Sequence, residues 1–379
     1  MSKGEDSILI IDPVGIKAGM DYYDQSLAGG LRDAGLNAFV GSNYKKDEWS
    51  YKIFDSEKKT SKIGKLTDLV KGVLRAIILA KRKKTKYVLL HIFSTEMKDW
   101  LTIILLRMAN LKVVSIAHDI SGFADTDVKW IKDSIFDKHS AIIIVHNRYS
   151  LEKFKQTVKT AADKIIRVIP HGSFVNLVDK NISKKDARDV LKIAPDSKVI
   201  LFFGQIKKVK GLDILLHAMP DVEKSITLVI AGKPWKDDFK TYGDIIKAHG
   251  LQSRVKLFIR YIEDSEREFF FKAADLLIIP YRAIFQSGVL LMGMSYQLPV
   301  LASDLEANRE VITDNENGML FRDGNSKDLA QKINLFFENE SQRERITKAG
   351  IQTMGQKHNW SAIALEYKKI LHENSNNRV

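Results

Sequence analysis

The feature that most restricts the fold is a repeated alternation of short, apolar, β-rich runs with amphipathic helical stretches. In the first half, strand patterns occupy residues 7–12, 37–40, 87–93, 112–117, 140–145 and 164–169, and helical spacing occupies 20–34, 66–78 and 99–109. Strands that alternate with helices in this way form parallel sheets with helices on both faces. The sequence therefore predicts an α/β protein with doubly wound sheets.

The second half restarts the same alternation. Strand patterns occupy residues 198–203, 226–231, 255–258, 276–280 and 299–302, and helical patterns occupy 211–219, 236–248, 264–274, 289–296 and 326–338. Because 379 residues exceed the roughly 100–200 of an ordinary domain, we expect two Rossmann-like domains facing each other across a cleft. Their predicted extents are 1–180 and 190–356, with the polar stretch 181–197 as the connection. We expect a C-terminal helix at about 360–375 to pack back on the first domain.

Composition excludes several classes of protein. The chain has no cysteine, which rules out disulfides, thiolate nucleophiles and cysteine zinc sites. No run reaches the roughly 18–20 apolar residues that span a bilayer, and a strand pattern so close to the N-terminus leaves no room for a signal peptide. We therefore expect a cytoplasmic protein.

The formal charge of +13 is the second compositional clue. Seven of the sixteen residues from 71 to 86 are lysine or arginine, which predicts a basic face. Such a face fits an anionic membrane, a phosphorylated substrate or nucleic acid, but also an ordinary solvated surface. The stretch lacks interleaved aromatic residues, which disfavours nucleic acid.

Two loops of the second half carry residue types that bind phosphate. Residues 203–211 (FGQIKKVKG) join a strand to a helix and place lysines between two glycines. Gln286, Ser287 and Gly288 open the helix 289–296, where backbone N–H groups can face an anion. Solvated lysines and an ordinary serine N-cap are the alternative interpretations. The first strand is not followed by GxGxxG, and neither GxxxxGK[ST] nor HExxH occurs, which disfavours dehydrogenases, P-loop enzymes and zinc proteases.

The order of motifs across residues 168–325 resembles that of GT-B glycosyltransferases, specifically the large, retaining family-4 group. The motifs are IPHG at 169–172, the loop 203–211, VIAGKP at 229–234, residues 273–281, residues 286–294, LPV at 298–300, Glu310 and NGMLF at 317–321. This resemblance implies a nucleotide-sugar donor site in the second half. The first half matches more faintly, through Gly15, Gly19 and the pair His118-Asp119.

The resemblance also implies roles for individual residues. Lys207 or Lys210 would neutralise the donor diphosphate, and the amides of Gly288 and Val289 would hold phosphate or sugar hydroxyls. Glu310 would approach the nucleotide ribose. The full set of implied donor-binding residues is Gly15, Gly19, Lys207, Lys210, Gly232, Tyr261, Gln286, Ser287, Gly288, Val289 and Glu310. The implied catalytic residues are His118 and Asp119; a structural histidine and a surface carboxylate at Glu310 remain the alternatives.

One departure from the family pattern concerns the paired glutamates that many members carry eight positions apart. The matching positions hold Ile284 and Met292, and we expect Gln286 to take part of the polar role, because an amide can bond a sugar hydroxyl without charge. The stereochemical outcome therefore stays open. A retaining reaction can pass the acceptor proton to the leaving phosphate, whereas an inverting one needs a base, for which Asp119 or His118 is the candidate. Asp125-Thr126-Asp127 has the form of a metal motif but lies in a polar loop of the first half.

Together these features predict transfer of a hexose-type sugar from a UDP- or GDP-sugar to a hydroxyl of a glycan or lipid-linked acceptor, in polysaccharide or glycoconjugate biosynthesis. We expect no metal, no other cofactor and no nucleic-acid partner, with a peripheral contact at the inner membrane face. Two alternatives remain: an inactive scaffold or partner subunit, and a nucleotide-sugar epimerase on the same fold.

Overall fold

The structure is a computed structural model that describes residues 7–16, 19–55, 61–118, 128–161, 163–235 and 238–376. The chain divides into two compact units, which are described separately. Unit 1 comprises Met1–Gly172 and His358–Val379, and unit 2 comprises Ser173–Lys357. Both units are parallel α/β sheets with helical connections, so the predicted α/β fold class is confirmed.

Unit 1 contains a seven-stranded sheet in the order β3-β2-β1-β4-β5-β6-β7, with every neighbouring pair parallel. All five residues of β1 are buried, which explains why its sequence is an uninterrupted apolar run rather than an alternating one. The strands are β1 Ser7–Ile11, β2 Asn37–Ser42, β3 Ser50–Lys52, β4 Tyr87–Ile92, β5 Lys112–Ala117, β6 Ser140–Val145 and β7 Ile165–Val168.

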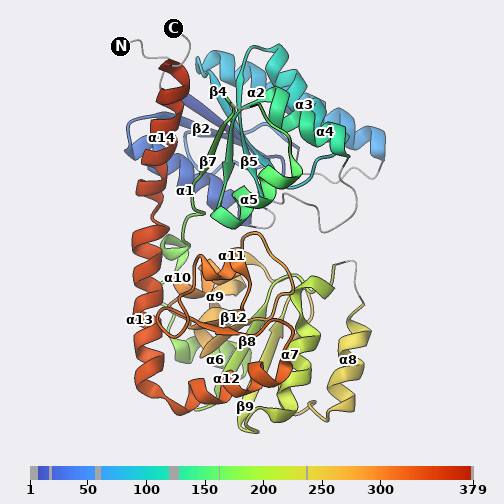
Figure 1. Ribbon diagram of the computed structural model, residues 1–379, viewed down its shortest axis with the longest axis vertical. Helices are drawn as coiled ribbons and strands as arrows, with labels where there is room; N and C mark the ends of the chain where they lie inside the picture. The colour runs from blue at the N-terminus through green and yellow to red at the C-terminus, as the bar shows by residue number, and fades with distance from the viewer. Residues whose placement is uncertain are drawn as a thin grey trace. The chain divides into compact units, whose positions relative to one another are not determined.

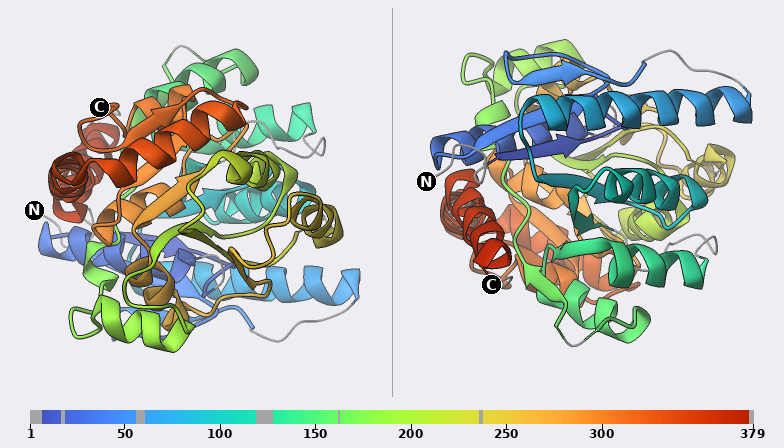
Figure 2. Two further views of the ribbon diagram at one scale, coloured as in Figure 1. Left: turned by 90° about the horizontal axis from the view of Figure 1, so that it is seen from below. Right: turned by 90° about the horizontal axis from the view of Figure 1, so that it is seen from above.

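The last helix of the chain belongs to unit 1. Figures 1 and 2 show α14, in red, packed beside α1, in blue. A Cβ on Gly30 of α1 would lie 2.9 Å from the carbonyl oxygen of Trp360, so the two helices approach closely. The helices of this unit are α1 Met20–Asp33, α2 Lys62–Arg82, α3 Met97–Met108, α4 Lys129–Asp133, α5 Arg148–Thr157 and α14 Trp360–Asn376, with a π-helical turn at Ser134–His139.

Helix α2 differs from its prediction in the face that it buries. An amphipathic helix is expected to bury its apolar stripe, here against the sheet of unit 1, but Leu66, Leu74 and Ile78 are each about half exposed. Val73 and Ala76 are buried instead, together with the small residues Gly72 and Ala80. Small side chains let the helix axis approach the sheet, because a Cβ on Gly72 would lie only 2.1 Å from the ring of Phe54. Leu66, Leu74 and Ile78 therefore remain at the surface.

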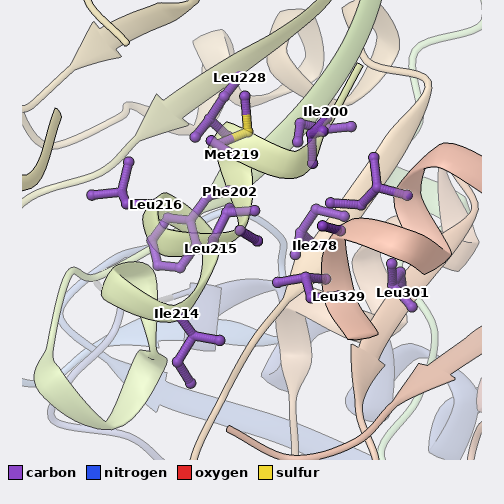
Figure 3. Close-up of a cluster of buried hydrophobic side chains, with 14 of the residues drawn as sticks. Ile200, Phe202, Ile214, Leu215, Leu216, Met219, Leu228, Ile278, Leu301 and Leu329 are labelled. Carbon is purple, nitrogen blue, oxygen red and sulfur yellow. The ribbon is translucent and has the colours of Figure 1, made fainter. Parts of the chain in front are cut away.

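Unit 2 contains a six-stranded sheet in the order β10-β9-β8-β11-β12-β13, again parallel throughout. Its core joins β8, β9 and β11 to helices α7 and α12, as the cluster around Phe202, Leu215 and Leu329 shows (Figure 3). The strands are β8 Lys198–Phe203, β9 Ile226–Ala231, β10 Val255–Phe258, β11 Leu276–Ile279, β12 Val300–Ser303 and β13 Met319–Phe321. The helices are α6 Lys184–Leu191, α7 Leu212–Ala218, α8 Phe239–Ala248, α9 Asp264–Ala273, α10 Gly288–Ser295, α11 Glu306–Arg309, α12 Ser326–Glu338 and α13 Glu340–Lys357.

The polar stretch 181–197, expected to be the connection between domains, is instead part of unit 2. Ser183 and Asp186 form a capping box that starts α6, which packs against α9. Arg188 of α6 is buried and donates from Nε to the carbonyl oxygen of Ala273, at 3.1 Å, and pairs with Asp275. The polar residues of this segment therefore cap and anchor a helix rather than solvate a linker.

Candidate functional site

The carboxyl edge of the unit 2 sheet brings three loops together where strand order reverses. The chain runs outward from β8 to β9 and β10 on one side, and to β11, β12 and β13 on the other. Ligands of open parallel sheets bind outside the strand ends at such a reversal. The amide of Gly204, after β8, donates to the carbonyl of Ala231 at the end of β9, at 2.9 Å. A Cβ on Gly232 would lie 1.8 Å from the Gly204 carbonyl oxygen, so only glycine fits there.

The loop 204–211 is held in one conformation by the segment that follows β11. Gly211 has a φ of 64°, and a Cβ there would lie 1.8 Å from the Pro280 carbonyl oxygen. The amide of Arg282 donates to the Val209 carbonyl, and its guanidinium forms two bonds of 2.8 and 2.6 Å with the carboxylate of Asp213. Sequence reasoning missed this pair, because its members lie 69 positions apart. The Arg282–Asp213 pair fixes the loop 204–211, called the lysine loop below, against the loop that follows β11.

Both predicted lysines lie over aromatic rings. The Nζ atom of Lys210 is 3.7 Å from the ring centroid of Tyr281, and that of Lys207 is 5.9 Å from the ring of Trp235. Tyr281 is buried, whereas Trp235 is half exposed. Aromatic faces attract cations, so these contacts keep two positive charges at the carboxyl edge. Trp235 was not predicted from the sequence; a tryptophan just after the strand-end motif VIAGKP is the signal that was available.

The start of α10 adds unsatisfied backbone donors to this edge. Ser287 is the N-cap, and its Oγ accepts from the amide of Leu290 at 3.2 Å. Gly288 is surrounded by open space: a Cβ there would meet only the ring of Phe174, at 3.9 Å. Val289 lies beside the end of β8, because a Cβ on Gly204 would be 3.6 Å from its Cγ2. The first N–H groups of a helix lack partners within the helix and attract anions.

Three other predicted donor residues lie in the loops of the same edge. Gln286 is partly buried just before the N-cap of α10. Tyr261 follows β10 and is half exposed, and Glu310 is exposed directly after α11. Where many family-4 members carry paired glutamates, Met292 is buried within α10 and Ile284 is partly buried.

The first strand–helix loop of unit 1 is built around Asp12. Its carboxylate accepts from the amides of Val14 and Gly15, at 2.8 and 2.7 Å. Gly15 has a φ of 63°, and a Cβ there would lie 1.9 Å from Oδ1 of Asn43, so the position requires glycine. Gly19 caps α1, also with positive φ, and among the residues that the structure describes a Cβ there would meet no atom within 4 Å. The two predicted glycines therefore differ: the protein itself encloses Gly15 and leaves Gly19 open.

Four histidines lie at the carboxyl ends of four successive strands in unit 1. His91 is in β4, and His118, His146 and His171 follow β5, β6 and β7. Nδ1 of His91 is 2.8 Å from Nε2 of His118, and Nε2 of His91 is 2.9 Å from Oδ1 of Asp24. Only His118 was predicted from the sequence. The other three also end apolar strand runs, a regularity that was visible but not used.

Burial lowers the pKa of every histidine in this row. The pKa of His118 falls well below its usual value, and the neighbouring histidines lower it further. Burial takes the pKa of His91 and His146 to about 4. All three rings are therefore neutral near pH 7, each with one donor and one acceptor nitrogen. The other predicted catalytic residue, Asp119, lies outside the described residues, as does the motif at 125–127.

Comparison with known proteins identifies the second half of the chain. Residues 183–353 match the family model described as glycosyl transferases group 1. The chain carries a group 1 glycosyltransferase domain. This domain contains the lysine loop and the start of α10, and it begins within the segment that was predicted to be a connection.

Curated relatives of this chain align over part of their length. An uncharacterized glycosyltransferase of Methanocaldococcus jannaschii is 27% identical over 241 residues, which cover 62% of this chain and 66% of that protein. The phosphatidyl-myo-inositol mannosyltransferase of Mycobacterium leprae is 29% identical over 178 residues, 46% of each chain. The chain thus aligns with about half to two thirds of these relatives.

Solved structures match the chain over nearly its whole length. A sucrose-phosphate synthase from Thermosynechococcus elongatus has a TM-score of 0.77 at 17% identity and covers 97% of this chain and 98% of its own. Anabaena HepE, solved with UDP and glucose, has a TM-score of 0.77 at 21% identity, with 97% and 99% covered. These matches establish the GT-B fold.

Two further features concern the described residues of this chain alone. Among them, no three or more histidine, aspartate or glutamate side chains are grouped so as to hold a metal ion. None of the helices in the described ranges combines the length and apolar character that crossing a bilayer requires.

Proposed function

We propose that this protein transfers a hexose-type sugar from a UDP- or GDP-sugar to a hydroxyl of a glycan or lipid-linked acceptor in polysaccharide or glycoconjugate biosynthesis. One observation carries the proposal. Two lysine ammonium groups lie over aromatic rings beside the loops after β8 and β9, and the open helix start at Gly288 borders the same strand ends. This is the chemistry that a nucleoside diphosphate needs.

The reaction asks the protein mainly to stabilise negative charge on the leaving diphosphate. Fixed cations and helix N–H groups do so most effectively when they are held in place before the reaction. The pair between Arg282 and Asp213, together with the close packing of Gly211 on Pro280, supplies that rigidity. Lys207 and Lys210 would contact the diphosphate, and the amides of Gly288 and Val289 would hold phosphate or sugar hydroxyls.

A thermal-shift panel of UDP-, GDP- and ADP-sugars tests the donor site. A ligand that binds only the folded state raises the unfolding temperature by mass action. We expect one nucleotide class to stabilise the wild-type protein and the shift to shrink in Lys210→Ala. If no nucleotide sugar shifts the transition at millimolar concentration, the donor assignment is wrong.

A turnover assay with the wild-type protein distinguishes this proposal from two alternatives. An inactive scaffold would bind the nucleotide sugar without transferring or hydrolysing the sugar. An epimerase would convert the nucleotide sugar with no acceptor present. The apolar residues at the paired-glutamate positions, Ile284 and Met292, are the observation that keeps the scaffold alternative in view. Sugar transfer to an added acceptor would exclude it.

The surface of α2 supports a peripheral contact with an anionic membrane. Lys81, Arg82, Lys83 and Lys84 are exposed at its C-terminal end. The same helix exposes Ile63, Leu66, Leu74 and Ile78. Near an anionic surface, each basic residue contributes about 1 kcal/mol, and aliphatic side chains beside the cations can enter the headgroup region. A lipid-linked acceptor would be reached from such a surface.

Liposome co-sedimentation tests this contact. We expect binding to anionic but not neutral vesicles, weaker at high salt, and lost when residues 81–84 become serine. A matched control removes four exposed lysines of unit 2 by the same change: Lys224, Lys247, Lys327 and Lys348. If both quadruple variants lose binding equally, net charge rather than α2 is responsible. If neutral vesicles bind equally well, the electrostatic explanation is wrong.

A further inference from the structure

Two pairs of an asparagine or aspartate followed by glycine lie at the two ends of β13, and the sequence contains no others. Asn317-Gly318 lies just before the strand, and Asp323-Gly324 follows it. In such a pair the glycine amide nitrogen can attack the preceding side chain, because glycine has no side chain that hinders the approach. Ammonia leaves an asparagine amide more readily than water leaves an aspartate carboxyl group. The sequence alone would therefore single out Asn317.

The fold protects Asn317 by holding both polar atoms of its side chain. Nδ2 donates to the carbonyl oxygen of Val311 at 2.9 Å and to Oγ1 of Thr353 at 3.0 Å. Oδ1 accepts from the amide of Thr313 at 2.8 Å, and the residue is only 8% exposed. Attack by the Gly318 nitrogen would require this side chain to leave all of these hydrogen bonds first.

Asp323 is in the opposite situation. Asp323 and Gly324 are both exposed, and within the described ranges neither the Asp323 carboxylate nor the Gly324 amide forms a hydrogen bond or a salt bridge. Gly324 has a φ of 69°, and a Cβ there would meet no described atom within 4 Å. Both the attacking nitrogen and the carboxyl group are therefore free to react.

We propose that Asp323 is a site of spontaneous isomerisation to isoaspartate, through a cyclic imide formed with Gly324. The amide nitrogen of Gly324 attacks Cγ of Asp323, the new C–N bond forms, and a carboxyl oxygen leaves as water with the amide proton and the carboxyl proton. Water then opens the imide at either carbonyl. Opening at the side-chain carbonyl restores aspartate, whereas opening at the main-chain carbonyl leaves the chain running through Cβ and Cγ. The mass of the product is unchanged.

Isomerisation would change both the backbone and the charge at the carboxyl edge of unit 2. It adds one carbon atom to the main chain within the turn in which the Asn325 amide donates to the Arg322 carbonyl, at 3.0 Å, and Asn325 is the N-cap of α12. The carboxylate is also close to Arg282. Hydrogen bonds to Asp213 raise the pKa of the Arg282 guanidinium most, and the charge of Asp323 adds to the rise. The product therefore alters the start of α12 and the charge beside the pair that fixes the lysine loop.

Peptide mapping of stored wild-type protein tests the proposal. The full chain is kept folded near neutral pH for weeks and then digested with trypsin, which yields peptides 310–322 and 323–327. We expect peptide 323–327 to split into two chromatographic forms of equal mass, one of which fragmentation identifies as isoaspartate, while Asn317 keeps its amide. A single aspartate form after storage, or earlier loss of the Asn317 amide, overturns the proposal.

Asp323→Asn provides the matched comparison, because it places the same residue pair at both ends of β13. It removes no hydrogen bond or salt bridge from the part of the chain that the structure describes, so we expect a melting temperature near that of the wild type. Position 323 should lose its amide roughly ten-fold faster than Asn317 or more, because Asn317 must first leave its hydrogen bonds. In urea the two positions should react at similar rates. Equal rates in the folded variant, or a difference that persists in urea, would show that the fold does not select position 323.

Discussion

Substitution of Gly288 tests the helix start of α10 without disturbing the fold. Its φ is not in the left-handed region, and a Cβ would touch only Phe174 at an ordinary 3.9 Å. Alanine at a helical position is more stable than glycine by roughly 0.5–1 kcal/mol, and valine falls between the two. We therefore expect Gly288→Ala and Gly288→Val to unfold at or slightly above the wild-type temperature.

Donor binding should respond in the opposite direction. A hydrogen bond from a backbone N–H to a charged phosphate contributes about 1.5–3 kcal/mol, which corresponds to roughly 10–150-fold in the dissociation constant. A branched side chain at position 288 would keep phosphate from the amides of Gly288 and Val289. We expect Gly288→Val to lose at least ten-fold in affinity by titration calorimetry and to abolish transfer.

Gly293 of the same helix provides the matched control. A Cβ there would lie 2.5 Å from Cδ2 of Leu277 and 3.0 Å from Cγ2 of Val300, inside the core. Gly293→Ala should cost about 1–3 kcal/mol of stability through overpacking, with donor affinity of the folded protein unchanged. Wild-type donor affinity and transfer in Gly288→Val would refute the reasoning and remove α10 from the site.

Three further predictions concern charge and protonation. Lys207→Ala and Lys210→Ala should each raise the donor dissociation constant by roughly ten-fold or more in the same calorimetric titration; wild-type values in both would contradict the diphosphate assignment. His118→Ala should lower turnover more than thermal stability, and an unchanged activity per folded molecule would indicate a purely structural residue. Because burial lowers the pKa of His146 to about 4, below its unfolded value near 6.5, its contribution to stability is present above pH 6.5 and lost as the pH falls toward 4. Melting curves at pH 7.5 and 5 should therefore show a smaller acid-induced decrease in His146→Gln, and an identical decrease would show that His146 does not titrate in this range.

The sequence predicted the parts of the fold that depend on local pattern. Uninterrupted apolar runs located β1 and β8, because strands buried on both faces need apolar residues at every position. Short or polar elements contain no such apolar run, so they could not be located in this way. The strand β13 has three residues, and α6 was taken for a linker because its buried face is held by Arg188 rather than by a long apolar stripe.

The candidate sites also contain parts that could be predicted from the sequence and parts that could not. The lysine loop and the start of α10 follow strand ends, so their position at the carboxyl edge could be derived from the sequence. Their partners could not: Arg282 meets Asp213 and Tyr281 meets Lys210 only after the sheet has formed. The contact between Asp24 and His91 was missed for the same reason, because 67 residues separate the two. Contacts across neighbouring strands have no signature in a single local pattern.

The placement of α14 in unit 1 has a consequence for biosynthesis. Unit 2 is one continuous segment, so all of its residues are synthesised before those of α14. Unit 1 cannot be completed before α14 is made, because Tyr23 of α1 contacts two residues of α14. The centroid of its ring lies 5.0 Å from that of Trp360, and its hydroxyl oxygen lies 3.5 Å from that of Tyr367. Until α14 has been synthesised, this face of α1 lacks the partner that covers it in the folded unit. Helix α1 is therefore synthesised before unit 2 but covered only after it, and we expect its uncovered face to be where a nascent chain of this protein depends most on a chaperone.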